Sequence, residues 1–200
     1  MPVCQDDPVG GVGAIQARGE RSSPLAVGVI IWLASEVMFF AGLFAAYFVL
    51  KAENANLWPP SDVELDVPRA AIATAVLVLS SITIHYAVVA AERGRLKQAY
   101  RLVVVTIALG ALFVTNLALE YASLDFRLDT HAYGTIFYLL TGFHGAHVVG
   151  GLVALSVMAW TVFSRGSRVP PGETIRVMSF YWHFVDVVWI GLFLVIYVVQ

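Results

Sequence analysis

The sequence predicts an all-α protein, a polytopic bundle of five membrane-spanning helices. Hydrophobic residues make up 59% of its 200 residues and charged residues only 13%, a balance outside the range of ordinary soluble domains. Apolar runs of about 20 residues or more recur along the chain, and this length crosses a hydrocarbon core of roughly 30 Å. Each run is continuous instead of alternating, so helices are favoured over the strands of a membrane barrel.

The apolar runs divide the chain into a tail and a membrane domain. We expect the helices at residues 27–50, 68–91, 99–122, 133–163 and 177–199. Charged residues or prolines end the runs, at Lys51 and Pro59–Pro60, at Glu92–Arg95, at Asp125–Asp129 and at Arg165–Pro171. Residues 1–26 are polar and Gly-rich and lack the apolar core of a signal peptide. We therefore expect a disordered cytoplasmic tail at 1–26, followed by a transmembrane domain at 27–200.

Basic residues predict how the bundle is oriented. With a cytoplasmic N-terminus, nine basic residues fall inside and three outside, which follows the positive-inside rule. The inside set is Arg18, Arg21, Arg93, Arg95, Lys97, Arg101, Arg165, Arg168 and Arg176, and the outside set is Lys51, Arg69 and Arg127. We expect the N-terminus inside and the C-terminus outside.

Ionisable residues within the predicted helices are candidates for function, because a charge in lipid is costly and needs a partner. Glu36 and Asp186 lie roughly 14 Å from the inner ends of their helices, at a rise of about 1.5 Å per residue. By the same measure His85 and His183 lie roughly 9 Å from the inner ends of theirs. The sequence therefore predicts that these residues share one polar layer in the inner leaflet.

The roles of these residues allow two interpretations. Glu36 is either a neutral or hydrogen-bonded carboxyl that takes part in proton traffic or lipid headgroup recognition, or a structural carboxyl satisfied by a neighbouring helix. His183 and Asp186 are three residues apart on one helix face, where they can hydrogen-bond to each other. The simpler interpretation is that this pair holds two helices together, and the alternative is that it forms a functional site.

Two further histidines lie on the fourth predicted helix, among glycines that would allow close helix approach. His144 and His147 could face a metal or haem together, but no Cys cluster, third histidine or carboxylate motif completes a ligand set. The sequence thus predicts no metal site, no catalytic residues and no cofactor of the chain's own. Cys4 is the only cysteine, so it cannot form an internal disulfide.

A basic cluster follows the second predicted helix. It consists of Arg93, Arg95, Lys97 and Arg101. These residues either only set the topology or also contact anionic lipid headgroups. The formal net charge is -2 and there is no basic stripe, so no feature of the sequence indicates binding to nucleic acid.

Four separated motifs together resemble subunit III of haem-copper cytochrome c oxidases. They are residues 32–48 (WLASEVMFFAGLFAAYF), the Trp58-Pro59-Pro60 loop, residues 133–151 (YGTIFYLLTGFHGAHVVGG) and residues 181–189 (YWHFVDVVW). The similarity spans about residues 27–200 in the family's order. Glu36 matches the family's carbodiimide-reactive carboxyl, and His144, His147, His183 and Asp186 match its motifs in the last two helices.

The resemblance implies a non-redox subunit of an aa3-type cytochrome c oxidase in a bacterial plasma membrane. Such a subunit binds catalytic subunit I directly, lies in one complex with subunit II and other subunits, and can join a larger respiratory assembly. It stabilises subunit I, binds phospholipid and supports proton uptake during oxygen reduction, while haem a and copper lie in partner subunits. The enzyme as a whole is a proton-translocating oxidoreductase.

Larger family members have seven spans, and this chain lacks the first two, which form one wall of the family's lipid cleft. Short members also accompany quinol oxidases and nitric oxide reductases, so the reductant stays open. From a different class, an autonomous transporter with a path past Glu36, His85, His183 and Asp186 is an alternative, although the sequence lacks the internal repeat of such folds. An integral haem or metal enzyme is a third interpretation.

Overall fold

The computed structural model describes residues 24–55, 58–60, 63, 65–166 and 170–199. Within these residues, five helices are long and apolar enough to cross a membrane, which confirms the predicted bundle. They are α1 (Pro24–Glu53), α2 (Val67–Glu92), α3 (Leu96–Ser123), α4 (Ala132–Trp160) and α5 (Pro171–Phe193). Two π-helical segments continue the last two helices, η2 (Thr161–Gly166) and η3 (Leu194–Val198). The tail predicted at 1–26 lies outside the described residues, except that residues 24–26 already belong to α1.

The last helix starts earlier than predicted. Its apolar run predicted a start at residue 177, whereas α5 starts at Pro171. A proline is tolerated in the first turn of a helix, because the N–H group that it lacks would have no hydrogen-bond partner within the helix. Arg176 in this polar segment pairs with Glu92 at the end of α2, with 3.1 Å between Nε and Oε1. Hydropathy marks the lipid-embedded part of a helix, so it did not detect this polar beginning.

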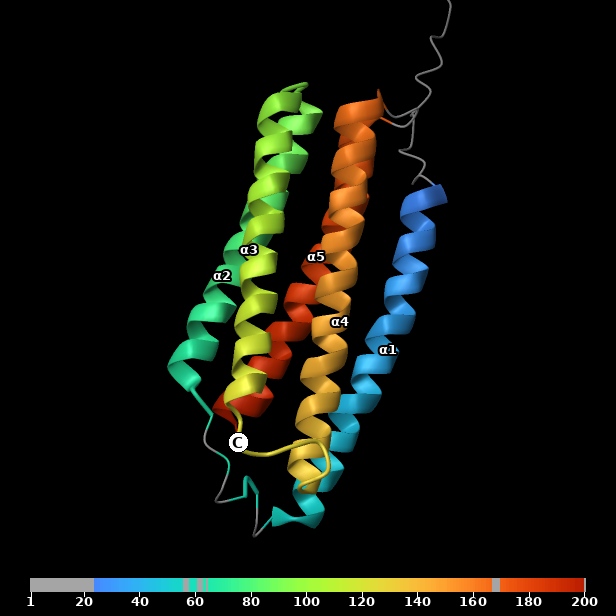
Figure 1. Ribbon diagram of the computed structural model, residues 1–200. Helices are drawn as coiled ribbons and strands as arrows, with labels where there is room; N and C mark the ends of the chain where they lie inside the picture. The colour runs from blue at the N-terminus through green and yellow to red at the C-terminus, as the bar shows by residue number, and fades with distance from the viewer. Residues whose placement is uncertain (1–23, 56–57, 61–62, 64, 167–169, 200) are drawn as a thin grey trace, which may run out of the picture.

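The helix α5 is central to the packing. It contacts α1, α2 and α4, while α2 packs against α3 and α3 against α4. Figure 1 shows α1 and α2 at opposite edges of the bundle, with α5 running obliquely behind α3 and α4. The start of α1 and the C-terminus lie at opposite ends of the bundle, as an odd number of spans requires (Figure 1). The side of the membrane on which each end lies stays a prediction from the basic residues.

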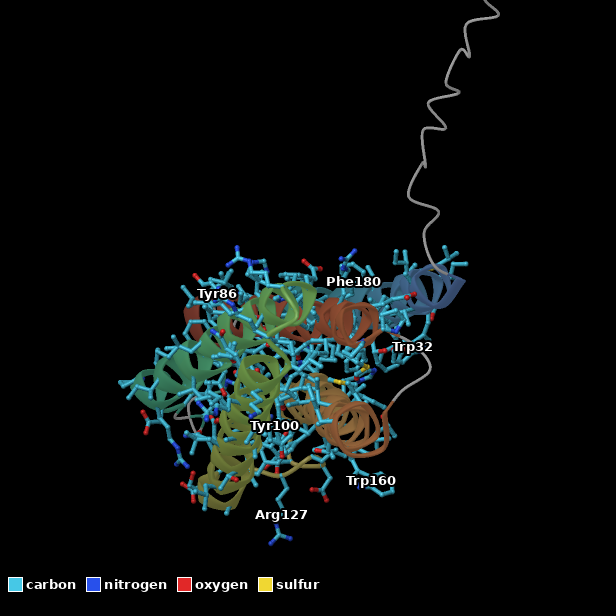
Figure 2. The ribbon with its side chains drawn as sticks, turned by 90° about the horizontal axis from the view of Figure 1, so that it is seen from above. Trp32, Tyr86, Tyr100, Arg127, Trp160 and Phe180 are labelled. Carbon is cyan, nitrogen blue, oxygen red and sulfur yellow. The ribbon has the colours of Figure 1, made fainter. Side chains whose placement is uncertain are left out.

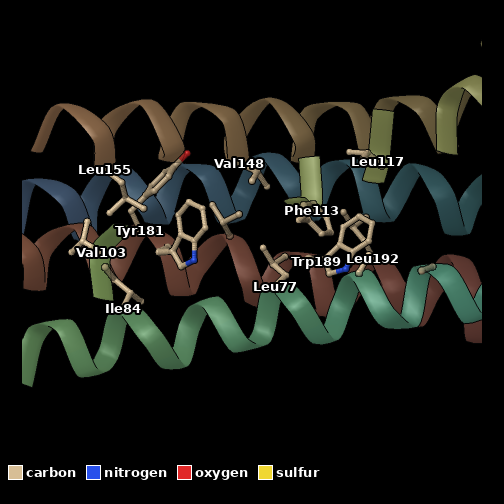
Figure 3. Close-up of a cluster of buried hydrophobic side chains, with 14 of the residues drawn as sticks. Leu77, Ile84, Val103, Phe113, Leu117, Val148, Leu155, Tyr181, Trp189 and Leu192 are labelled. Carbon is tan, nitrogen blue, oxygen red and sulfur yellow. The ribbon is translucent and has the colours of Figure 1, made fainter. Parts of the chain in front are cut away.

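The core forms where aromatic side chains of α5 meet small residues on α3 and α4. Trp182 is fully buried, and its indole Nε1 donates to Ser80 Oγ of α2 over 2.8 Å. A Cβ at Gly110 of α3 would lie 2.7 Å from Cη2 of Trp182. A Cβ at Gly151 of α4 would lie 2.8 Å from Cε1 of Tyr181, which Figure 3 shows among the buried side chains of the core. Close approach of these rings therefore requires glycine at both positions.

The helix α1 is the least covered of the five. Only 6% of its most apolar window is buried inside the chain, against 50% for α5. Large aromatic side chains also lie on the outside of the bundle (Figure 2), namely Trp32, Tyr86, Tyr100, Trp160 and Phe180. The faces of α1 that no other helix covers must therefore contact lipid or another protein.

Candidate functional site

Glu36 of α1 and His147 of α4 form an acid–histidine pair between two helices. The distance between Glu36 Oε2 and His147 Nε2 is 3.0 Å. Both side chains are largely buried, with 20% of Glu36 and 18% of His147 exposed. The sequence grouped Glu36 by depth with His85, His183 and Asp186, and in the structure the hydrogen-bond partner of Glu36 is His147.

A second hydrogen bond of His147 fixes the location of one proton. Its Nδ1 lies 2.7 Å from the backbone carbonyl oxygen of Phe143, one turn earlier on α4. A carbonyl oxygen only accepts hydrogen bonds, so Nδ1 carries a proton and donates it. The Nε2 then either accepts from a protonated Glu36 or, in the imidazolium, donates to the Glu36 carboxylate.

Both arrangements place one proton between Glu36 and His147 and leave the pair with no net charge. An isolated charge in the membrane interior is costly, and a pair without net charge lowers that cost. Moving the proton from oxygen to nitrogen requires no change of partner. The pair can therefore hold a proton at this depth and exchange it along a single hydrogen bond.

Aromatic rings enclose the pair. The ring centroids of Phe40 and His147 lie 5.1 Å apart, and those of Phe39 and His147 6.4 Å. On the other side, the Tyr181 hydroxyl donates to the backbone carbonyl of His147 over 2.8 Å. Trp32 stacks on Tyr181 with ring centroids 5.3 Å apart, which joins α1 to α5.

A cavity of about 410 Å³ lies beside the pair, between α1, α4 and α5. Its lining is mainly apolar, with His147 and Tyr181 as the titratable residues among Val29, Trp32, Ala146, His147, Gly150, Ala154, Val177, Met178 and Tyr181. A hydrocarbon chain suits such a lining, because apolar walls offer it close contact and demand no hydrogen bonds.

A separate polar group joins α2 to α5. His183 Nδ1 lies 2.8 Å from the Ser81 hydroxyl, and that hydroxyl also hydrogen-bonds Asp186 Oδ2. The sequence allowed a direct hydrogen bond between His183 and Asp186, whereas in the structure Ser81 of α2 lies between them. His85 is exposed on α2, with its ring against Tyr86.

The two histidines of α4 have different surroundings. His144 is completely buried, and neither ring nitrogen has a hydrogen-bond partner among the described residues. Its ring lies against Trp189 and Phe113, with centroids 4.9 Å and 5.9 Å away. Among the residues that the structure describes, no group of three or more His, Cys, Asp or Glu side chains is placed to bind a metal ion.

The basic cluster lies at the turn from α2 to α3 and the start of α3. A groove of about 510 Å³ is lined by Leu96, Lys97, Tyr100, Arg101, Val162 and Phe163. A neighbouring hollow of about 450 Å³ is lined by Gly94, Arg95, Leu96, Lys97, Gln98 and Arg101. Arg93, which the sequence grouped with these residues, lines neither.

Sequence reasoning missed two polar contacts. Ser81 was not singled out, although its position four residues before His85 places both on one face of α2. Glu120 was not among the candidate residues, and it is only 4% exposed and accepts a hydrogen bond from Tyr197 over 2.7 Å. The hydroxyl partner of Glu120 lies 77 residues further along the chain, so no local pattern indicates it.

Comparison with known proteins places the chain among oxidase subunits. The family model for cytochrome c oxidase subunit III matches residues 18–200. A probable cytochrome c oxidase subunit 3 of Nocardia farcinica is 45% identical over 185 residues, which is 90% of each chain. The cytochrome c oxidase subunit 3 of Thermostichus vulcanus is 35% identical over 186 residues, 92% of each chain. That of Pelomedusa subrufa is 34% identical over 181 residues, 86% of this chain and 69% of its own.

Proposed function

This chain belongs to the cytochrome c oxidase subunit III family, and on that premise we propose that it is the non-redox subunit III of an aa3-type cytochrome c oxidase. Membership makes it a multi-pass membrane subunit of a multi-subunit respiratory oxidase. Its proposed tasks are to stabilise catalytic subunit I, to bind phospholipid and to support proton uptake. Haem a and copper belong, on this proposal, to partner subunits.

The Glu36–His147 pair is the observation that carries the proton role. It supports that role because Glu36 Oε2 and His147 Nε2 lie 3.0 Å apart between two helices, in segments otherwise apolar enough for lipid. The pair belongs to α1, the helix that the rest of the chain covers least. A partner subunit packed against α1 would lie close to this proton, which supports a role in buffering or feeding protons.

Two features support lipid binding. The cavity beside His147 has the apolar lining that an acyl chain requires. The groove at the start of α3 combines Lys97 and Arg101 with the apolar surface of Val162 and Phe163, which suits a phosphate headgroup above a hydrocarbon chain. The names of the relatives favour cytochrome c over quinol as the reductant, since these proteins are described as cytochrome c oxidase subunits.

Affinity purification of the tagged chain tests the assignment to the complex. The expected result is co-purification of a haem-containing catalytic subunit in a fixed ratio. Removing the chain from that complex should leave the haem spectra nearly unchanged while proton uptake slows and catalytic lifetime shortens. Unchanged turnover and durability after depletion, or transport activity of the chain alone in liposomes, would contradict the proposal.

A further inference from the structure

Asp186 is a carboxyl group inside the bundle with almost no hydrogen-bond support. Its side chain on α5 is 4% exposed. The Oδ1 atom has no hydrogen-bond partner among the described residues, and the only partner of Oδ2 is the Ser81 hydroxyl of α2. Within the described part of the chain, no Lys or Arg forms an ion pair with Asp186, since the ion pairs found there join Glu36 to His147 and Glu92 to Arg176.

These surroundings favour the protonated form of Asp186. An ionised carboxylate has two oxygens that accept several hydrogen bonds, and here it would have one hydroxyl donor and one oxygen with none. Burying a charge without a counter-charge or hydrogen bonds is far costlier than burying a neutral acid. The geometry therefore indicates a neutral carboxylic acid at rest.

Ser81 connects this acid to an imidazole. Its hydroxyl lies 2.8 Å from His183 Nδ1 and also contacts Asp186 Oδ2. A hydroxyl donates one hydrogen bond and accepts others, so it can take a proton from one neighbour while giving its own to the second. His183 is only partly buried, and His85, one turn from Ser81 on α2, is exposed. The chain of contacts thus runs from the buried acid of α5, through Ser81 of α2, to the partly buried imidazole of His183 on α5.

We propose that Asp186, Ser81 and His183 form a proton-holding site, separate from the Glu36–His147 pair. In the transfer, the proton on Asp186 Oδ2 moves to Ser81 Oγ while the Ser81 proton moves to His183 Nδ1. The O–H bond of the acid breaks, an N–H bond forms, and the products are a carboxylate and an imidazolium that attract each other. The reverse step restores the neutral acid, and no other reactant is needed.

This inference goes beyond the proposed function, and it depends on contacts between α2 and α5 instead of on α1. The Glu36–His147 pair joins α1 to α4, so the two sites share no residue and no hydrogen bond. Either site can be altered while the other is retained. A test can therefore separate failure of this site from failure of the assignment to an oxidase.

Infrared spectroscopy of the purified oxidase complex, with ¹³C-labelled aspartate for assignment, tests the protonation of Asp186. The carbonyl stretch of a protonated aspartic acid should be present in the wild-type complex and absent from Asp186→Asn. Ser81→Ala should keep this band and shift it to higher frequency, because the acid loses its hydroxyl partner. Ser80→Ala is the matched control, since Ser80 accepts from Trp182 and does not contact Asp186.

A band that disappears from the carboxylate region in Asp186→Asn would overturn the proposal, because it would show an ionised residue. So would identical acid bands in Ser81→Ala and Ser80→Ala. If Asp186→Asn does not assemble, the labelled wild type and the two serine variants still decide the question, because they leave the acid in place.

Deuterium exchange of the acid band tests the relay. The band should move to its deuterated position in wild type and do so roughly fivefold or more slowly in His183→Gln and Ser81→Ala, because each change removes one link of the hydrogen-bonded path. Glu36→Gln should leave the exchange rate unchanged. Equal rates in wild type and His183→Gln would show that the proton reaches Asp186 by another route, and the relay would be rejected.

Discussion

The hydroxyl of Tyr181 donates a hydrogen bond of 2.8 Å to the backbone carbonyl of His147. This contact joins α5 to α4 directly beside the acid–histidine pair. The His147 carbonyl lies in the helix while its ring reaches Glu36 of α1, so one residue connects three helices. The position of the pair thus depends on the packing of α5 as well as on its own two side chains.

Replacement of Tyr181 by Phe should loosen this junction. The change keeps the ring that stacks on Trp32 and removes one hydrogen bond, so we expect a loss of about 1 kcal/mol in stability. Thermal inactivation of the complex measures it. Tyr86→Phe is the control, because Tyr86 is 57% exposed. Equal inactivation temperatures for the two variants would contradict a structural role for the Tyr181 hydroxyl.

Two substitutions of Glu36 separate hydrogen bonding from proton exchange. In Glu36→Gln the amide can donate to His147 Nε2, so the complex should assemble with stability close to wild type. In Glu36→Leu the Nε2 of the partly buried His147 loses its partner, which should cost about 1–3 kcal/mol. Both variants should slow proton uptake by the complex, because neither holds an exchangeable proton at this position. Uptake in Glu36→Gln that equals wild type at every pH would reduce the pair to a structural contact.

Much of the fold could be predicted from the sequence, because a helix that crosses lipid needs a continuous apolar run of about 20 residues. Continuous apolar runs gave the number of helices and most of their boundaries. The start of α5 at Pro171 was not predicted, since its first turns are polar and paired with Glu92 outside the apolar run. Hydropathy describes the surroundings of a helix, whereas its ends depend on caps and ion pairs.

The candidate site was predicted only as a set of residues. Glu36 and His147 were both singled out, but their pairing depends on how α1 lies against α4, 111 residues apart in the chain. Depth along each helix placed Glu36 with Asp186, and depth does not say which way a side chain points around the helix axis. Ser81 was missed because serine in an apolar span is common and gains meaning only from the partners it meets.

The glycines of α4 differ in how much space a side chain would have, and we expect Gly151→Ala to destabilise the protein more than Gly142→Ala. A Cβ there would lie 2.8 Å from the Tyr181 ring, so the packed aromatic cluster must shift at a cost of about 1–3 kcal/mol. Gly142→Ala is the matched control, because its nearest new contact is the Tyr121 hydroxyl at 3.7 Å. The sequence predicted that these glycines allow helix approach, and at Gly151 the approaching groups are aromatic side chains instead of a backbone.

The yield of intact complex and its thermal inactivation measure both glycine variants. Gly151→Ala should lower both, and Gly142→Ala should change stability by less than about 0.5 kcal/mol. Similar losses in the two variants would show that the close contact around Tyr181 does not limit the packing of α4 against α5.

Removal of two charges from the groove at the start of α3 should release bound anionic phospholipid. Lys97 and Arg101 line this groove together with Val162 and Phe163, so a phosphate can meet cations while its acyl chains follow apolar surface. In a Lys97→Gln, Arg101→Gln variant we expect affinity for phosphatidylglycerol or cardiolipin to fall roughly tenfold or more, since each basic residue near an anionic surface contributes separately. The effect should weaken at high salt, because exposed charges are screened.

Native mass spectrometry of the detergent-solubilised complex, with quantitation of co-purified phospholipid, measures this loss. Arg127→Gln is the matched control, because Arg127 is an exposed cation in the α3–α4 connection, at the other end of α3. The double variant should lose anionic lipid while zwitterionic lipid stays unchanged, since only the anionic headgroup interacts strongly with the missing charges. Equal lipid content in the double variant and in Arg127→Gln would assign the basic cluster to membrane topology alone.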